Sequence, residues 1–217
     1  MLRRMLRFFF YHFYHTFAWT YDFVADLVSI GRWHDWIQTA IPYIHGNCVL
    51  EVGHGPGHLQ ELLMAENQLI VGLDESPQMG RLTKQRLEKA GHFKINLTRA
   101  IAESLPFADE TFNTILSTFP TEYIFELQTL SAIHRVLDKN GRFIVLPSAW
   151  ITGQKLLDKC TAWLFKITGQ SPAVTQAVVI ERINKLFEAS GFRSEFKTVE
   201  IKSSTVLLVI ASKLNGL

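Results

Sequence analysis

Two kinds of hydrophobic pattern alternate along most of the chain. Short runs of valine, leucine and isoleucine end in glycine or polar residues, as buried strands commonly do. These runs predict strands at 47–52, 69–74, 93–98, 112–117 and 142–146. Between them, apolar residues recur every three or four positions, which is typical of one face of a helix. These stretches predict helices at 58–65, 76–90, 122–137 and 180–190.

Turn and cap residues mark where some of these elements begin or end. Ser76 and Pro77 are typical of a helix start, with a capping side chain followed by proline in the first turn. Asn140–Gly141 predicts a turn just before the fifth strand. Residues 194–203 and 205–212 predict a final pair of strands.

Strands separated by helices predict parallel βαβ units. We therefore expect an α/β fold, a Rossmann-like doubly wound and mostly parallel seven-stranded sheet with an antiparallel C-terminal edge hairpin. Residues 43–217 form this domain, and 1–42 form an N-terminal helical cap with helices at 21–31 and 33–41. In such folds ligands bind beyond the carboxyl ends of the strands, so the residues after the first four strands are site candidates.

A segment after the fifth strand predicts a helical insert at about 150–172. Its apolar residues lie on one helical face: Ile151, Leu156, Leu157, Cys160, Trp163, Leu164 and Ile167. With the aromatic N-terminus, this face is a candidate wall of an apolar pocket. In the alternative interpretation, the two segments bury each other's apolar faces.

The first 19 residues place three arginines before an aromatic run at 8–17. Tyrosine and histidine interrupt that run, which is too short to span a bilayer and lacks the cleavage site of a signal peptide. One hypothesis is a helix that packs over the domain, and we favour it because most apolar helical stripes are core. The other is a basic, aromatic helix that lies in a membrane surface.

Composition excludes several classes of protein. Apolar residues make up 47% of the 217 residues and charged residues 19%, which indicates a globular domain with a full core. The net charge of +2 gives no support for nucleic-acid binding. Cys48 and Cys160 lie far apart and form neither a disulfide framework nor a metal-binding pair, so we expect a cytoplasmic protein without a metal.

The strongest local motif is a glycine loop between the first strand and its helix. Glu51 is followed by Gly53, Gly55 and Gly57. Glycines allow a tight turn and close approach of a ligand, and the next helix directs free N–H groups toward it. Asp74 ends the second strand, where it can accept hydrogen bonds from ribose hydroxyls. Together these features predict a nucleoside ligand.

The spacing of the loop argues against a pyrophosphate. The dinucleotide fingerprint is G-x-G-x-x-G, whereas this chain has G-x-G-x-G and places His58 where the third glycine belongs. Glu51 would repel a pyrophosphate but would attract an ammonium group. This points away from NAD and toward S-adenosylmethionine, which carries an amino-acid tail and a sulfonium.

Four segments resemble class I S-adenosylmethionine-dependent methyltransferases. VLEVGHGPGH resembles their first motif and GLDESPQM their acidic second motif, while AESLPFADETFNTILSTF and LDKNGRFIVL resemble later segments. The resemblance covers about 21–146 and is closest to the small-molecule and lipid-quinone subgroup, whose N-terminal helices carry a pair like Tyr21–Asp22.

The resemblance implies S-adenosylmethionine as cofactor and S-adenosylhomocysteine as product. Glu51 and the glycines would hold the methionine end, the second-strand carboxylate the ribose, and the later segments the adenine and sulfonium. The implied cofactor-binding residues are Tyr21, Glu51, Gly53, His54, Gly55, Gly57, Asp74, Glu75, Met79, Ala102, Glu103, Ser117 and Thr118. Two departures stand out: Ala100–Ile101 replaces a common Gly-Asp pair beside the adenine, and Asn113 replaces an aspartate that is mostly structural.

Methyl transfer from a sulfonium is an in-line displacement in which the protein mainly aligns the reactants. Some acceptors also need a base. Candidates are Glu122 and Tyr123 after the fourth strand, and His15 in the N-terminal segment together with His12 and His34.

The acceptor is expected to be small and apolar or lipid-like. The residues after the fourth strand, Thr118–Phe119–Pro120–Thr121, differ from the motif of amino-methylating nucleic-acid enzymes, and no basic stripe replaces it. Two rival functions stay open, a catalytically silent S-adenosylmethionine-binding or membrane-surface module and an NAD(P)-dependent oxidoreductase. The oligomeric state is left open.

Overall fold

The computed structural model describes residues 29, 31–65, 69–151 and 172–214. Its strands are β1 (Cys48–Val52), β2 (Leu69–Asp74), β3 (Asn96–Arg99), β4 (Phe112–Thr118), β5 (Leu137–Ile151), β6 (Phe192–Ile201) and β7 (Ser204–Lys213). Its helices are α3 (Trp33–Gln38), α4 (His58–Ala65), α5 (Pro77–Lys89), α6 (Leu127–Val136) and α8 (Pro172–Ala189), with 3-10 turns η2 (Ile41–Tyr43) and η3 (Glu122–Phe125).

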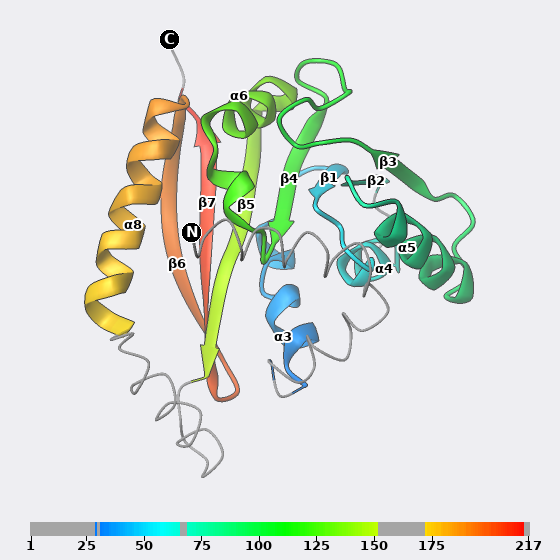
Figure 1. The fold of residues 1–217 in the computed structure, drawn as a ribbon, viewed down its shortest axis with the longest axis horizontal. Coiled ribbons are helices and arrows are strands. Elements are labelled where there is room, and N and C mark those ends of the chain that lie inside the picture. Colours follow the sequence, from blue (N-terminus) through cyan, green and yellow to red (C-terminus); the bar gives the residue numbers. More distant parts are fainter. Residues whose placement is uncertain (1–28, 30, 66–68, 152–171, 215–217) are drawn as a thin grey trace, which may run out of the picture.

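The strands form one sheet in the order β3-β2-β1-β4-β5-β7-β6 (Figure 1). All neighbouring pairs from β3 to β5 are parallel, and β7 is antiparallel to both β5 and β6. The predicted α/β class, strand number and terminal hairpin are therefore confirmed. Strand order reverses between β1 and β4, and in doubly wound sheets ligands bind at that reversal.

The sheet is buried on both faces because successive strand residues point to opposite sides. In β5, Phe143 and Val145 pack with α6 and α8, whereas Ile144 and Leu146 pack with α3 and α4. Figure 1 shows α8 alongside β6 at one end of the sheet, with α4 and α5 toward the other end. The glycine loop joins β1 of this sheet to α4, and Gly57 in the loop packs against Thr83 of α5.

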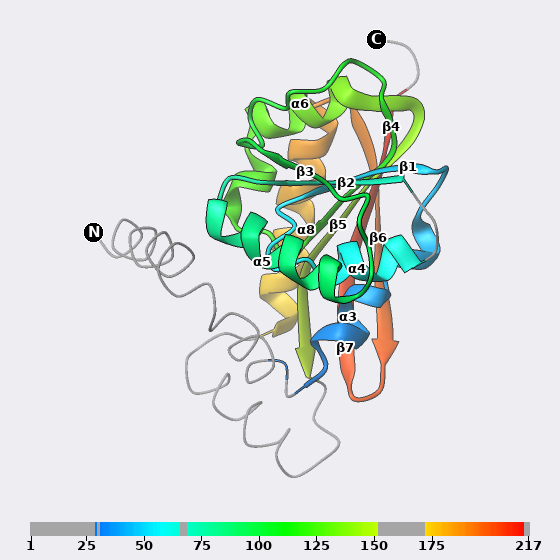
Figure 2. The ribbon, with the colours of Figure 1, turned by 90° about the vertical axis from the view of Figure 1, so that its right-hand side faces the viewer.

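The long strands β5, β6 and β7 extend past the others, and their far ends lie beside α3 (Figure 2). There the Arg32 guanidinium donates hydrogen bonds to Ser203 O at 3.1 Å and to Ser204 Oγ at 3.2 Å. Lys202 at the hairpin turn pairs with Asp35 in α3. The β6–β7 hairpin therefore holds the start of α3 in place.

Two predicted elements differ in shape from those observed. The single helix expected at 122–137 divides into η3 and α6, because Glu126 has extended backbone angles (φ −74°, ψ 139°). The turn expected at Asn140–Gly141 lies inside β5. Phe112 pairs with Leu137 while Thr114 pairs with Arg142, so residues 138–141 form an irregularity within a longer strand.

The boundaries of three further elements also differ from the predictions. Trp150 and Ile151 pair with β7, so the start of the predicted helical insert is strand, and that part of the prediction is wrong. β3 begins at Asn96, and Phe93 is 82% exposed in the irregular segment before it. α8 begins at Pro172 rather than at residue 180. The rest of the insert, the helix predicted at 21–31 and the segment 1–19 lie outside the described residues.

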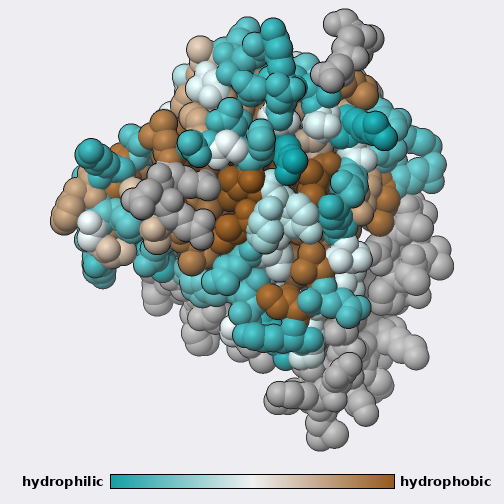
Figure 3. Space-filling model, turned by 180° about the vertical axis from the view of Figure 1, so that it is seen from behind, coloured by the Kyte–Doolittle hydropathy of each residue, from teal (hydrophilic) through white to brown (hydrophobic). Residues whose placement is uncertain are grey.

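Large apolar side chains reach the surface singly in the described ranges. Those at least 40% exposed are Leu69, Phe93, Ile101, Leu127 and Leu214. Figure 3 shows hydrophobic residues on the rear face in separate patches bordered by hydrophilic ones. None of the helices in the described part of the chain has the length and apolar character needed to cross a bilayer.

An aromatic group joins α8 to the sheet and provides a stability test. Phe187 is fully buried, stacks on Phe143 at 5.7 Å between ring centroids, and lies 5.8 Å from Phe192. We expect Phe187→Ala to lower the free energy of unfolding by about 3–5 kcal/mol, because it removes a buried ring and leaves a cavity. Urea unfolding measures the loss, and exposed Phe93→Ala should change stability little. Equal effects of the two substitutions would contradict this account.

Candidate functional site

The loop between β1 and α4 depends on glycine for its shape. Gly53, Gly55 and Gly57 have φ of +75°, +53° and +85°, values that side-chain-bearing residues rarely adopt. A Cβ on Gly57 would lie 2.5 Å from Thr83 Cγ2, and one on Gly53 would collide with the Tyr123 hydroxyl. A Cβ on Gly55 would meet no described atom within 4 Å. The loop is packed at two glycines and open to an incoming ligand at the third.

Asp74 at the carboxyl end of β2 connects this loop to α5. Its Oδ2 accepts a hydrogen bond from Gly55 N at 3.0 Å, and its Oδ1 accepts one from Ser76 N at 2.9 Å. Ser76 in turn caps α5 by accepting a hydrogen bond from Met79 N. A carboxylate has about four acceptor positions, so Asp74 retains capacity for hydroxyl donors.

Glu51 is a buried acid directly before the loop. Its side chain is 1% exposed, and Gln60 Nε2 donates a hydrogen bond to its Oε2 at 2.8 Å. Burial is the main cause that raises the pKa of Glu51 to about 8; the Gln60 hydrogen bond opposes the rise and the negative charge of Asp74 adds to it. No ion pair to Glu51 is found within the described residues. Among the residues that the structure describes, this carboxyl group has no cation beside it, and it fits a ligand that brings one.

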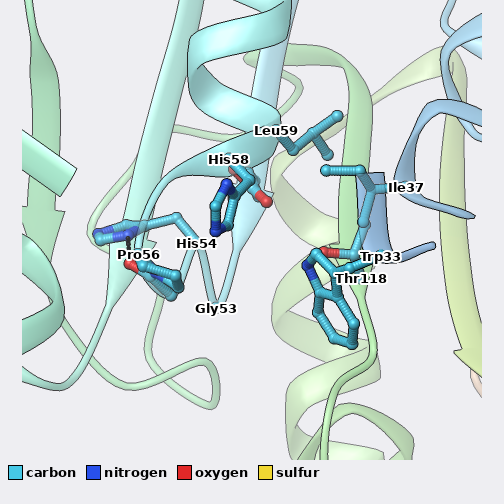
Figure 4. Close-up of a pocket in the computed structure, with 10 residues that line it drawn as sticks. Trp33, Ile37, Gly53, His54, Pro56, His58, Leu59 and Thr118 are labelled. Carbon is cyan, nitrogen blue, oxygen red and sulfur yellow. Dashed lines mark hydrogen bonds between the residues drawn. The ribbon is translucent and has the colours of Figure 1, made fainter. Parts of the chain in front are cut away.

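The side chain of His54 is buried and contacts both the glycine loop and α5. Its Nδ1 lies 2.7 Å from Gly55 O and 3.1 Å from Thr83 Oγ1, and burial lowers the pKa of the imidazole. A Cβ added to Gly72 would lie 2.9 Å from His54 Cδ2, which places the ring against β2. Figure 4 shows this ring directed away from Trp33. The neutral ring thus supports the loop, and its predicted contact with the cofactor stays a prediction.

A small pocket opens between the loop and α3 (Figure 4). In Figure 4, His58 and Gly53 lie on one side of it and Trp33 and Ile37 on the other. Its lining residues are Trp33, Ile37, Glu51, Gly53, His54, Gly55, Pro56, His58, Leu59 and Thr118. The pocket lies at the carboxyl ends of β1 and β4, where the strand order reverses.

The structure brings some of the predicted site residues together and separates others. Ser117 Oγ donates a hydrogen bond to Val52 O at 2.8 Å, so this buried hydroxyl joins two strands. Met79 and Ala102 are buried, Glu103 is half-buried, and Glu75 is exposed with its carbonyl accepting a hydrogen bond from Arg99.

The candidate bases are also separated. Glu122 is exposed in η3, outside the pocket lining, whereas the Tyr123 hydroxyl lies against Gly53. His15, like Tyr21, lies outside the described residues. Tyr123 is therefore the described candidate nearest to the loop.

Several lining residues were missed by the sequence analysis. Trp33 and Ile37 lie four positions apart, a spacing that places them on one face of α3. His58 entered the sequence analysis only as a departure from the dinucleotide fingerprint. The helical spacing was a usable indication, but nothing in the sequence showed that α3 faces the loop.

Asn113 and Ile101 stand where the family that the sequence resembles commonly has aspartate, and the structure shows what surrounds each of them. Asn113 Oδ1 accepts a hydrogen bond from Cys48 N at 3.2 Å, which confirms a structural role. Ile101, which replaces an aspartate, is 51% exposed beside buried Ala102.

A strained residue follows β4 at the edge of the pocket. Phe119 has φ of +48°, an unusual value for an aromatic residue, and its N–H donates to Leu146 O at 2.8 Å. Its ring lies 4.4 Å from that of Trp33 and 5.9 Å from that of Trp36, measured between centroids. In this backbone conformation the Phe119 ring packs against the rings of Trp33 and Trp36 in α3. Of the three, Trp33 lines the pocket.

Part of the chain is similar in sequence to known methyltransferases. A family model described as a methyltransferase domain matches residues 49–141, which include the glycine loop, Asp74 and β4. The ubiquinone/menaquinone biosynthesis C-methyltransferase UbiE of Geotalea uraniireducens (strain Rf4) is 30% identical over 139 residues, covering 60% of this chain and 59% of that protein. UbiE of Marinomonas sp. (strain MWYL1) is 32% identical over 142 residues, covering 61% of this chain and 56% of that protein. These similarities support the class I methyltransferase family that the sequence motifs resemble.

Solved structures of methyltransferases share the fold. A SAM dependent methyltransferase from Aquifex aeolicus matches with a TM-score of 0.57 and 16% identity, over 82% of this chain and 88% of that chain. The family recognised in the sequence is confirmed, and S-adenosylmethionine is the cofactor of that family. The chain spans less than two thirds of the length of the UbiE relatives that it matches.

The raised pKa of Glu51 predicts how the stability of the protein depends on pH. The unfolded chain releases the Glu51 proton near the ordinary pKa of 4.5, whereas the folded protein keeps it until about pH 8. Stability that is fully present below the lower value is therefore lost as pH rises through this window. We expect Glu51→Gln, which has no such proton, to gain stability relative to the wild type between these pH values. Urea unfolding across the window measures the difference, and parallel pH profiles would contradict the assignment.

Proposed function

We propose that this protein transfers the methyl group of S-adenosylmethionine to a small, apolar, quinone-like acceptor. The buried carboxyl group of Glu51, which has no cationic partner among the described residues, is the observation that carries the proposal. A ligand ammonium group placed there would stabilise the ionised carboxylate, which burial otherwise disfavours. The amino-acid tail of S-adenosylmethionine supplies such a group.

The rest of the loop supports a nucleoside with that tail. Gly55 is open to a ligand, and α4 begins directly after the loop with its N–H groups at that end. Asp74 lies next to Gly55 and retains acceptor positions for the two ribose hydroxyls. When bound, S-adenosylmethionine would supply the electrophilic methyl group, and the chain's own residues would position it.

The aromatic rings of Trp33, Trp36 and Phe119 support an apolar, planar acceptor. Trp33 lines the pocket across from Gly53 (Figure 4), and the Phe119 ring packs against both Trp33 and Trp36. Aromatic rings favour offset or edge-to-face contact with one another. The relatives named above are quinone-biosynthesis C-methyltransferases, which agrees with such an acceptor. Contact of residues 1–19 with a membrane surface, where such acceptors partition, stays a hypothesis.

Tyr123 is the residue that we assign to the acceptor side. Its hydroxyl lies against Gly53, at the point where β1 enters the loop, and it belongs to the short η3 turn after β4. The neutral phenol there can orient the acceptor by a hydrogen bond, and its phenolate form can accept a proton from it. Glu122 is exposed in the same turn and is the alternative base.

Cofactor binding is tested first, with the product. S-adenosylhomocysteine at 100 times its Kd should stabilise the protein by about 2.7 kcal/mol, visible as a rise in Tm. Asp74→Asn should weaken binding roughly tenfold or more, because one acceptor oxygen is replaced by a donor. Glu88→Gln on the exposed side of α5 is the control and should bind as the wild type does. Binding of NADH in place of S-adenosylhomocysteine would overturn the proposal.

Turnover is tested with S-adenosylmethionine and a set of demethylated quinols. We expect a methylated product detected by mass spectrometry, and Tyr123→Phe should lower kcat about 100-fold or more while Kd for S-adenosylhomocysteine stays unchanged. Glu122→Gln serves as the comparison and should retain most of the activity. Cofactor binding without any methylated product would support the catalytically silent alternative, and equal losses in both variants would contradict the role of Tyr123.

A further inference from the structure

The short helix α3 carries the pocket residue Trp33 at its start. The helix has six residues, Trp33–Gln38, and an isolated helix of that length is unstable in water. Trp36 and Ile37 in its second half are buried in the core, whereas Trp33 is half-buried. Core packing therefore fixes the later part of α3, and the part that lines the pocket depends more on contacts outside the core.

The β6–β7 hairpin contacts the start of α3 at two points (Figure 2). The guanidinium of Arg32, the residue just before the helix, donates hydrogen bonds to Ser203 O at 3.1 Å and to Ser204 Oγ at 3.2 Å. Lys202 forms an ion pair with Asp35, the third residue of the helix. Ser204 is 1% exposed, so the hairpin end that receives Arg32 is itself packed into the protein. We call these two contacts the hairpin anchor.

Lys202 stands where the backbone favours glycine. Ile201 pairs with Ser204, so Lys202 and Ser203 form a two-residue loop. Lys202 has φ of +54°, and two-residue hairpin loops favour glycine, asparagine or aspartate where φ is positive. Strained residues of this kind are commonly kept where they serve a function. The ion pair that its ammonium group forms with Asp35 gives the lysine such a function.

We propose that Arg32 and Lys202 position Trp33 for the acceptor by holding the start of α3 against the hairpin. This inference rests on the proposed function, because it assigns Trp33, which lies across the pocket from Gly53, to the acceptor side (Figure 4). Without the hairpin anchor, fewer molecules hold Trp33 in that place, and the apparent affinity for the acceptor falls with that fraction. Arg32 and Lys202 act through Trp33 and are positioning residues.

The variant Lys202→Gly separates positioning from folding. Glycine adopts the positive φ without strain, so Tm should not fall. The ion pair to α3 is lost, so KM for the quinol acceptor should rise about twofold to fivefold, as an exposed ion pair provides. The values of kcat and of Kd for S-adenosylhomocysteine should stay unchanged. A lysine with a purely structural role would give the opposite result, a lower Tm with an unchanged KM.

Matched variants make the result specific. Asp35→Asn should raise KM by the same factor, and combining it with Lys202→Gly should give no further rise, because both remove one interaction. Lys202→Arg keeps the cation and should retain the wild-type KM. Arg32→Gln should raise KM roughly tenfold, because it removes hydrogen bonds from a charged donor. Glu88→Gln breaks the exposed Lys84–Glu88 pair in α5 and should leave KM unchanged.

Hydrogen exchange measures the hairpin anchor without an acceptor. Mass spectrometry of the full-length protein bound to S-adenosylhomocysteine follows the amides of residues 33–38. Their exchange should be faster in Lys202→Gly and in Asp35→Asn than in the wild type, because local opening of α3 becomes easier. Exchange in β1 and β4 should stay the same in all three proteins.

The outcomes separate this inference from the proposed function. If quinols are methylated but the variants of Lys202 and Asp35 keep the wild-type KM, the positioning role is wrong and the proposed function stands. Unchanged exchange in α3 would also contradict the positioning role. If the wild type binds S-adenosylhomocysteine and methylates no quinol, the proposed function is overturned and this inference with it.

Discussion

The two hydrogen bonds accepted by Asp74 hold the site together. One comes from Gly55 in the glycine loop and the other from Ser76 at the start of α5, so one carboxylate joins elements that follow β1 and β2. Because the loop residues have left-handed backbone angles, the open loop conformation needs such an external partner. The neighbouring Glu51 is buried and keeps its proton up to about pH 8, and a cation that enters the site would favour the ionised form of its carboxyl group. Scaffold and binding site therefore use the same groups.

Much of the fold follows directly from hydrophobic periodicity. The strands at 48–52, 69–74 and 112–118 and the helix at 58–65 agree closely with the predictions, because each combines an apolar pattern with glycine or polar residues near a boundary. The errors arise where tertiary pairing decides the structure. β5 continues to Ile151 because β7 pairs with it, and Trp150 alone gives no sign of that partner.

The cofactor side of the site was also predictable, whereas the opposite wall was not. Glu51, the glycines and Asp74 are close in sequence to strand ends, and parallel strands bring their carboxyl ends together. Trp33 reaches the pocket only because α3 packs across the sheet, and Phe119 turns toward it through a strained backbone. Those contacts depend on three-dimensional packing between segments that are distant in the chain, which single-sequence patterns do not encode.

The anchoring of α3 by the β6–β7 hairpin connects the last strands to the pocket entrance. Lys202 and the backbone of Ser203 hold Asp35 and Arg32, which flank the pocket residue Trp33. A surface ion pair alone contributes little, but here it is joined by a guanidinium bound at two points. The placement of Trp33 against the glycine loop thus depends on contacts made by the last two strands, more than 160 residues further along the chain.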